Sequence, residues 1–324
     1  MRDLNAIRRP VEAELERYSR MFQETLTHED SLLGQALAHI RQRRGKMMRP
    51  LLVLLVAKEF GTVGTTAVRS AVALELLHTA SLVHDDVVDS SSERRGQAAE
   101  HALFGNKVAI LVGDYMLSKC LQQAAQTGDV RIVDIIARLG GTLSEGEVRQ
   151  LANIRTAGCS EDAYFSIIRN KTAALFEACA RLGALSSGAA PEVADAAARL
   201  GEIIGICFQI RDDIFDYYAD TRIGKPTGND IAEGKLTLPA IYAANGTDRE
   251  DVLRWVQHVK TRTATQEEIG YLVNFTKQAG GIDYARTVME RYREEALPLI
   301  ATFRNAEVRT ALEGYLDYTI GREH

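Results

Sequence analysis

Apolar residues recur at helical spacing along most of the chain. Between residues 65 and 89 they follow one another at intervals of three, four and seven positions, and no glycine or proline interrupts them. The same pattern predicts further long helices over residues 106–126, 128–152, 161–187, 192–218 and 281–304. Several of these segments are apolar around much of their circumference, which is typical of helices inside a large bundle. We therefore expect an all-α fold with few or no strands.

Composition and charge narrow the class of protein. Of the 324 residues, 46% are hydrophobic and 26% are charged, which excludes a disordered chain. The net charge is −5, so no general basic field is available to attract nucleic acid. The strongest apolar run, residues 51–57, is too short for a membrane span, and the N-terminal residues do not resemble a signal peptide. Because the four cysteines form no CxxC pair, we expect a cytoplasmic protein with reduced thiols.

Two motifs of the form DDxxD each end a long apolar helix. Their carboxylates are Asp85, Asp86 and Asp89 in the first motif, and Asp212, Asp213 and Asp216 in the second. Residues four apart lie one above the other on a helix, so each motif presents two stacked carboxylates with a third beside them. Such a cluster opposes the helix dipole and costs stability unless cations are supplied. Mg²⁺ suits it, because this ion binds oxygen ligands and bridges carboxylates to phosphates.

A solvated acidic face is the alternative interpretation of a single DDxxD motif. The second copy favours metal binding, because residues 203–210 carry no charge and Asp212 and Asp213 follow this apolar stretch almost directly.

Basic residues accompany both motifs. They are Lys46, Arg49, Arg94, Arg95, Lys171, Lys225 and Lys235. The last two lie in a glycine-rich segment, residues 220–235, whose polarity and length predict a functional loop. Lys171 and Thr172 fall in the middle of an apolar helix, where a lysine is costly unless it meets an anion.

Any single basic residue could instead be an ordinary solvent-exposed side chain. His78 lies two turns before Asp85, and the alternative for it is a buried core histidine. As a set, the residues indicate capture of phosphate groups beside the acidic motifs. They predict a single large helical bundle around a central apolar cavity, with diphosphates at one end and an apolar chain inside.

On these motifs the chain resembles the trans-isoprenyl diphosphate synthases of the polyprenyl synthetase family. The matching segments are GKMMRP (45–50), LLHTASLVHDDVVDSSSERRG (76–96), GDY (113–115), EGEVRQL (145–151), KTAALF (171–176), FQIRDDIFD (208–216) and GKPTGNDIAEGKLTLP (224–239). The resemblance implies the isoprenoid synthase fold, as one domain over residues 1–324. It implies a prenyltransferase that condenses isopentenyl diphosphate onto farnesyl or geranylgeranyl diphosphate by ionisation, condensation and elimination. It further implies a homodimer whose product supplies quinone side chains.

The resemblance also assigns roles to individual residues. All six carboxylates of the DDxxD motifs would hold Mg²⁺, with three ions per site. The allylic diphosphate would be bound by Arg94, Lys171, Thr172, Gln209, Lys225 and Lys235, and isopentenyl diphosphate by Lys46, Arg49, His78 and Arg95. Catalytic roles are implied for Asp85, Asp89, Asp212, Lys171, Lys235 and Arg94. The family's basic C-terminal tail is represented only by residues 322–324, so the resemblance supports no closing contact there.

Product length is predicted from residues 80 and 81, which lie about 6–7.5 Å below Asp85 on the same helix. They are Ala80 and Ser81, where short-chain members of the family commonly carry an aromatic residue. We expect an open tunnel past Leu77 and Ala73. The candidates for its floor are Ile132, Ile136 and Leu139. This predicts a long-chain all-trans product of roughly six to ten isoprene units, with about eight as the central value.

Three other functions stay open: a short- or medium-chain synthase, a class I terpene cyclase, and a non-catalytic partner subunit. A cyclase usually mixes Asn, Ser or Thr with Glu at its second metal site, where this chain has DDIFD. It would also have no use for Lys46, Arg49 and His78 around a second diphosphate. A partner subunit would typically have lost Asp or basic residues of the motifs, and this chain has lost none.

Overall fold

The predicted all-α architecture is confirmed. The structure is a computed structural model that describes residues 3–42, 45–90, 93–94, 97–154, 160–218 and 227–322. Its α-helices are α1 (Leu4–Arg8), α2 (Glu12–Thr25), α3 (Ser31–Gln42), α4 (Met48–Lys58), α5 (Thr65–Val88), α6 (Glu100–Phe104), α7 (Asn106–Ala125), α8 (Val130–Ile154), α9 (Glu161–Ile168), α10 (Ala174–Leu185), α11 (Pro191–Phe215), α12 (Asn229–Ala232), α13 (Leu238–Asn245), α14 (Glu250–Lys260), α15 (Gln266–Gln278), α16 (Gly281–Ala301) and α17 (Ala306–Gly321). A 3-10 helix, η1 (Arg9–Val11), and a π-helix, η2 (Arg169–Ala173), join α1 to α2 and α9 to α10. The strands β1 (Glu93–Arg94) and β2 (Gln97–Ala98) form one short antiparallel ladder.

The long helices match their sequence patterns to within a few residues at each end. The expected helix over 161–187 is three elements in succession, α9, η2 and α10, because the backbone shifts to π-helical hydrogen bonding at Arg169–Ala173. In the segment expected to be an irregular loop, 220–235, the helix α12 occupies Asn229–Ala232. Residues 220–226 of that segment lie outside the described part of the chain.

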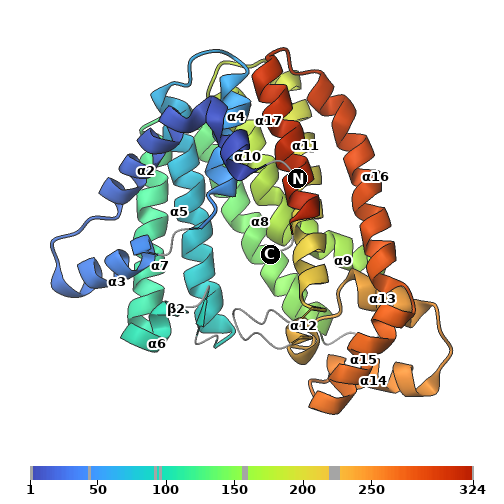
Figure 1. Cartoon of the computed structure of the whole chain (residues 1–324). Coiled ribbons are helices and arrows are strands. Elements are labelled where there is room, and N and C mark those ends of the chain that lie inside the picture. Colours follow the sequence, from blue (N-terminus) through green and yellow to red (C-terminus); the bar gives the residue numbers. More distant parts are fainter. Residues whose placement is uncertain are drawn as a thin grey trace.

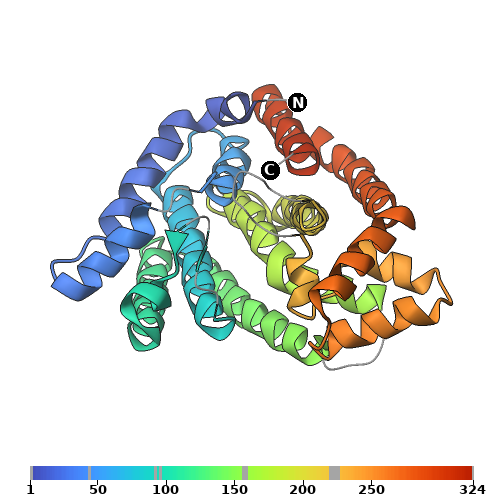
Figure 2. The same ribbon diagram turned by 60° about the horizontal axis from the view of Figure 1, so that its bottom comes forward.

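The long helices run roughly alongside one another and enclose α11 (Figure 1). Figure 2 shows α11 almost end-on near the middle, with α2 and α3 on one side and α16 and α17 on the other. Buried apolar side chains from Ile7 to Leu316 form one connected core, and every residue from 51 to 57 of α4 is fully buried within it. Among the described residues, no helix is long and apolar enough to cross a membrane.

One close approach inside the bundle sets the geometry of the later site. Gly205 of α11 packs so tightly on η2 that an added Cβ atom would stand 2.6 Å from the Cα atom of Ala173. A side chain at this position would therefore push the two helices apart. Because Gln209 lies one turn further along the same face of α11, this contact brings Gln209 beside Thr172.

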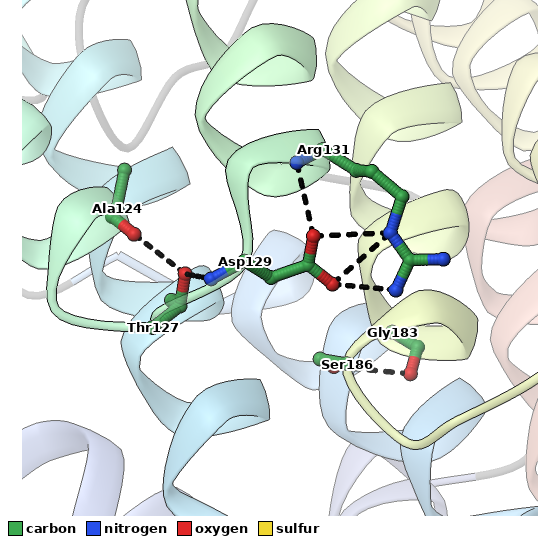
Figure 3. Close-up of polar contacts among 6 residues, drawn as sticks. All are labelled: Ala124, Thr127, Asp129, Arg131, Gly183 and Ser186. Atoms are coloured by element: carbon green, nitrogen blue, oxygen red, sulfur yellow. Dashed lines mark hydrogen bonds and ion pairs between the residues drawn. The ribbon is translucent and has the colours of Figure 1, made fainter.

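The turn between α7 and α8 is fixed by side-chain hydrogen bonds (Figure 3). The Thr127 hydroxyl donates to the Ala124 carbonyl oxygen at 2.5 Å and accepts the backbone N–H of Asp129 at 3.3 Å. Asp129 then caps α8: its Oδ1 accepts the backbone N–H of Arg131 at 2.9 Å, and its Oδ2 accepts the guanidinium of Arg131 at 2.6 Å. Nearby, the Ser186 hydroxyl donates to the Gly183 carbonyl oxygen at the end of α10.

We predict that Asp129→Ala lowers the free energy of unfolding by about 1 kcal/mol at neutral pH, since the N-cap of α8 is lost. The hydrogen bond from Arg131 lowers the pKa of the Asp129 carboxyl. A lowered folded-state pKa gives stability above the unfolded pKa, about 3.9, that is lost as the pH falls through the folded value. Urea unfolding at pH 7 and pH 3 measures the effect. A difference from wild type that is the same at both pH values would contradict it.

Candidate active site

A cavity of about 850 Å³ lies between α5, α8, the η2–α10 segment and α11. Both DDxxD motifs reach it, through Asp85 on one wall and Asp212 on the other. Other residues singled out in the sequence also line it: Arg49, His78, Ser81, Lys171, Thr172 and Gln209. Aliphatic side chains line it as well, among them Leu77, Leu117, Leu143 and Leu175. The cavity therefore brings acidic and basic groups together with aliphatic side chains.

The first motif does not present its carboxylates together. Asp85 lines the cavity and Asp89 is exposed at the C-terminal end of α5, but Asp86 is only 1% exposed and is buried in the protein. Neighbouring residues on a helix are turned by about 100°, so Asp86 faces another wall of the bundle. Asp86 is therefore buried and, unlike Asp85, is not part of the cavity wall.

The end of α5 is held against α7 by His84. Its Nε2 atom lies 3.1 Å from the Ile110 carbonyl oxygen and 3.6 Å from Oδ1 of Asp114. Gly113 makes this approach feasible, because an added Cβ atom there would overlap the His84 ring. The GDY motif thus positions the first acidic motif against α7.

In the second motif each carboxylate has a different environment. Asp212 lines the cavity and pairs with the guanidinium of Arg322. Asp213 is 2% exposed and accepts hydrogen bonds from the Tyr164 hydroxyl at 2.5 Å and from Nε2 of Gln209 at 2.8 Å. Burial raises the pKa of the Asp213 carboxyl well above its usual value, and the charge of Asp230 raises it further.

Asp216 acts as a cap on α12. It accepts the backbone N–H of Asn229 at 3.1 Å and that of Asp230 at 3.0 Å, and its own carbonyl oxygen accepts the N–H of Gly228. This carboxylate therefore ties the end of α11 to the chain that follows the loop. Its backbone partners leave it turned toward α12, and it does not line the cavity.

The π-helix η2 carries two of the predicted phosphate ligands. Lys171 pairs with the Glu147 carboxylate of α8 and lies 3.4 Å from Oε1 of Gln150. The Thr172 hydroxyl donates to Oε1 of Gln209 at 2.7 Å. Because Gln209 also donates to Asp213, a hydrogen-bonded chain runs from Thr172 through Gln209 to the second motif. Single π-helical turns inside α-helices occur frequently at functional sites.

Lys235 lies close to the first motif and to Asp230. Its ammonium pairs with Glu233 at 2.6 Å. Burial disfavours the charged form, but the hydrogen bond to Glu233 and the charges of neighbouring carboxylates together outweigh burial, and the pKa of Lys235 is raised. The charges of Asp89 and Asp230 raise this pKa further, so Lys235 interacts electrostatically with a residue of the first motif.

The GKMMRP segment places two cations at the start of α4. Met47, between them, has a left-handed backbone with φ of 52°, which a methionine adopts rarely. The Lys46 ammonium lies 5.6 Å from the ring centre of Tyr318. The Arg49 guanidinium lies 5.0 Å from the ring centre of Phe176 and 5.7 Å from that of Phe208. Lys225, Arg95 and the side chain of Arg94 lie outside the described residues.

The residues predicted to control product length divide into two groups. Ser81 lines the cavity, whereas Ala80 is fully buried and is not part of its wall. The deepest α5 residue on the wall is Leu77, and an added Cβ atom on Gly140 of α8 would touch its Cδ1 atom at 3.8 Å. The expected opening past Ala73 is absent from this cavity. The expected floor residues, Ile132, Ile136 and Leu139, lie instead in the buried core.

The carboxylates fit a Mg²⁺ ion whose remaining ligands are waters and a phosphate. Within the described residues, no three His, Cys, Asp or Glu side chains gather closely enough to hold an ion by themselves. Mg²⁺ is commonly bound by one or two carboxylates, several waters and the phosphates of a substrate. Asp85 and Asp212 on opposite walls of one cavity are a donor set of this kind.

Sequence reasoning missed Tyr164, Glu147, His84 and Arg322. Tyr164 could have been found, because it lies seven residues before Lys171 and so on the same helical face. Arg322 could not, since 110 residues separate it from Asp212. Arg322 thus contacts the second motif, although the resemblance gave no support for a contact by the C-terminal residues.

Comparison with known proteins agrees with this geometry. A family model described as Polyprenyl synthetase matches residues 30–276. The octaprenyl diphosphate synthase of Haemophilus influenzae is 32% identical over 323 residues, which cover 99% of this chain and 98% of that protein. The heptaprenyl diphosphate synthase component 2 of Geobacillus stearothermophilus is 34% identical and covers 97% of this chain and 95% of its own.

Solved structures extend the comparison. A geranylgeranyl pyrophosphate synthase from Bacteroides thetaiotaomicron is 48% identical with a TM-score of 0.87, covering 98% of this chain and 99% of its own. A polyprenyl synthase from Caulobacter crescentus, complexed with calcium and isoprenyl diphosphate, has a TM-score of 0.93 at 30% identity, covering 99% and 98%. Fold and site together define a trans-isoprenyl diphosphate synthase. The chain belongs to the polyprenyl synthetase family and is a prenyltransferase.

We predict that Tyr164→Phe lowers the free energy of unfolding by about 1.5 to 3 kcal/mol, since buried Asp213 loses a hydroxyl donor. We also expect it to lower kcat, because Asp213 adjoins the cavity residue Asp212. Urea unfolding and steady-state kinetics measure the two effects. The matched control is Tyr284→Phe, which removes a hydroxyl–carboxylate bond to Glu161 away from the cavity. Equal kcat values in the two variants would argue against a positioning role for Tyr164.

Proposed function

We propose that this chain is a Mg²⁺-dependent synthase that condenses isopentenyl diphosphate onto an allylic diphosphate and makes a long-chain all-trans polyprenyl diphosphate for quinone side chains. The observation that carries the proposal is the mixed lining of the 850 Å³ cavity. Asp85, Asp212 and Lys171 line it together with several leucines. An ionic head with a hydrocarbon tail is the type of substrate that matches both kinds of lining.

The basic residues support two diphosphate positions. Lys171 and Thr172 on η2 and Lys235 near Asp89 support an allylic diphosphate between the two motifs. Lys46 and Arg49 on the other side, with His78 lining the cavity, support isopentenyl diphosphate. Stacking on Phe176 and Phe208 holds Arg49 in place without neutralising it, so its charge stays available for a phosphate.

The reaction starts when the allylic C–O bond breaks and its electron pair leaves with the diphosphate. Asp85, Asp89 and Asp212 would hold Mg²⁺, which would supply Lewis-acid stabilisation of this leaving group. Lys171 and Lys235 add fixed positive charge, and the hydrogen bond from Thr172 positions Gln209 beside the second motif. The double bond of isopentenyl diphosphate then forms the new C–C bond. A proton passes to the released diphosphate, and the apolar cavity wall excludes water from the carbocation.

We assign different tasks to the carboxylates within each motif. Asp85, Asp89 and Asp212 are proposed as metal ligands, because they line the cavity or lie exposed at its edge. The burial of Asp86 and Asp213 and the capping bonds of Asp216 support positioning roles for these three instead.

We further propose that residues 1–324 form one domain that assembles as a homodimer. The single connected core supports the first statement. The second is supported by large apolar side chains exposed along α6 and α7, namely Leu103, Ile110, Leu111 and Leu121. An apolar stripe of this length is typical of a covered surface.

A shorter product, geranylgeranyl diphosphate or a near neighbour in length, is the second candidate. It is favoured by the position of Leu77, which among the α5 residues on the cavity wall lies farthest from Asp85, about 12 Å along the helix. The long-chain product is supported by the small residue Ser81 on the cavity wall and by the similarity to an octaprenyl diphosphate synthase.

The metal proposal predicts that Asp85→Ala or Asp212→Ala lowers turnover by about 100- to 1000-fold, while the fold survives. Diphosphate release from farnesyl diphosphate with Mg²⁺ is measured with and without isopentenyl diphosphate. Asp134→Ala, which removes an exposed carboxylate paired with Arg138 on α8, is the control and should retain activity. Release without isopentenyl diphosphate would indicate a cyclase, and no release by wild type would indicate a binding subunit.

The cavity floor predicts opposite shifts in product length for two substitutions. Ser81→Phe should shorten the products, because the ring would fill the cavity one turn below Asp85. Leu77→Ala should lengthen them by opening the deep end toward Ala73. Product chromatography with farnesyl and geranylgeranyl diphosphate measures both, with exposed Leu253→Ala on α14 as the control. If both variants stay active with the wild-type product pattern, the growing tail follows another route.

A further inference from the structure

The residue that follows α17, Arg322, is fastened onto the second acidic motif. It is only 8% exposed, and its Nη2 atom donates to Oδ1 of Asp212 and, at 3.3 Å, to the Phe208 carbonyl oxygen. Its guanidinium carbon lies 4.1 Å from the ring centre of Phe208 and 5.5 Å from that of Phe215. A guanidinium held by a carboxylate and two aromatic rings is a specific contact rather than a chance surface pairing.

The backbone of Arg322 is also bound by α11, the helix that carries the second motif. Nε of Arg211 donates to the Arg322 carbonyl oxygen at 2.7 Å, and a second N–H of the Arg211 guanidinium donates to the same atom. The contacting residues of α11 are Phe208, Arg211, Asp212 and Phe215, spaced at three, four and seven positions. They therefore lie on one face of α11, which binds both the side chain and the backbone of a single arginine.

Asp212 is the only residue of the second motif, all three of which are described, that lines the cavity. In this structure the positive partner of Asp212 is Arg322 of the same chain. A carboxylate that is already paired with a guanidinium is a poorer ligand for a divalent cation, because the guanidinium and the cation repel each other at contact distance. Arg322 and a metal ion are thus alternative partners for one carboxylate.

We propose that Arg322 is a functional residue of the metal site: its guanidinium occupies Asp212 when no divalent cation is bound, and cation binding at the second motif displaces it. The inference rests on the proposed function, because it assumes that Asp212 is a metal ligand. Binding of the cation and docking of Arg322 on Asp212 are linked, so each weakens the other by the same factor. A cation that displaces Arg322 therefore loosens the end of α17, and removal of Arg322 strengthens cation binding.

The test is direct binding of Mn²⁺, followed by the electron paramagnetic resonance signal of the free ion. Arg322→Met retains an apolar contact with Phe208 but removes the charge, and should bind Mn²⁺ about tenfold more tightly than wild type. Arg293→Met is the matched control. It breaks the ion pair between Arg293 of α16 and Asp317 of α17, away from Asp212, and should leave the Mn²⁺ affinity unchanged. Asp212→Asn should weaken Mn²⁺ binding in both backgrounds.

Hydrogen exchange of the wild-type protein provides a readout that needs no substitution. Addition of Mn²⁺ should increase exchange of the backbone amides at residues 318–322, as the end of α17 is released. Equal Mn²⁺ affinities in wild type and Arg322→Met, with binding still lost in Asp212→Asn, would overturn the Arg322 inference alone. Mn²⁺ binding that is unaffected by Asp212→Asn would overturn the metal assignment and the inference with it.

Discussion

The structure depends on how negative charge is accommodated at the end of a buried helix. α11 is surrounded by other helices, so the carboxylates at its C-terminal end cannot all be solvated. Each one instead has its own partner from a distant part of the chain: Arg322 for Asp212, Tyr164 for Asp213, and the first turn of α12 for Asp216. Several elements therefore converge on this one helix end because unpaired buried charge is costly.

The same constraint explains the irregular backbone around the site. At η2 the helix departs from regular α-helical geometry where Lys171 and Thr172 must reach neighbouring helices. The left-handed conformation of Met47 interrupts the chain between Lys46 and Arg49 in the same way. Irregular backbone thus occurs at two of the segments that carry charged side chains to the site.

Helical periodicity and motif spacing were sufficient to predict the fold and to bring Asp85 and Asp212 into one cavity. They could not show which carboxylates turn inward, because the direction of Asp86 and Asp213 depends on neighbours that the local sequence does not reveal. Long-range pairing such as that of Arg322 leaves no local pattern at all. Ala80 illustrates a further limit: a small residue at a tunnel position is as compatible with close helix packing as with an open wall.

Leu77 and Asp85 both line the cavity about two turns of α5 apart, and this distance has an evolutionary consequence. Gly140 of α8 faces Leu77, and neither position carries a charged or polar side chain. Mutation can therefore alter the depth of the cavity while the bond-breaking apparatus stays under separate selection. A lineage of such enzymes can diversify in product size through a few aliphatic positions. This is consistent with similar proteins bearing names from geranylgeranyl to octaprenyl diphosphate synthase.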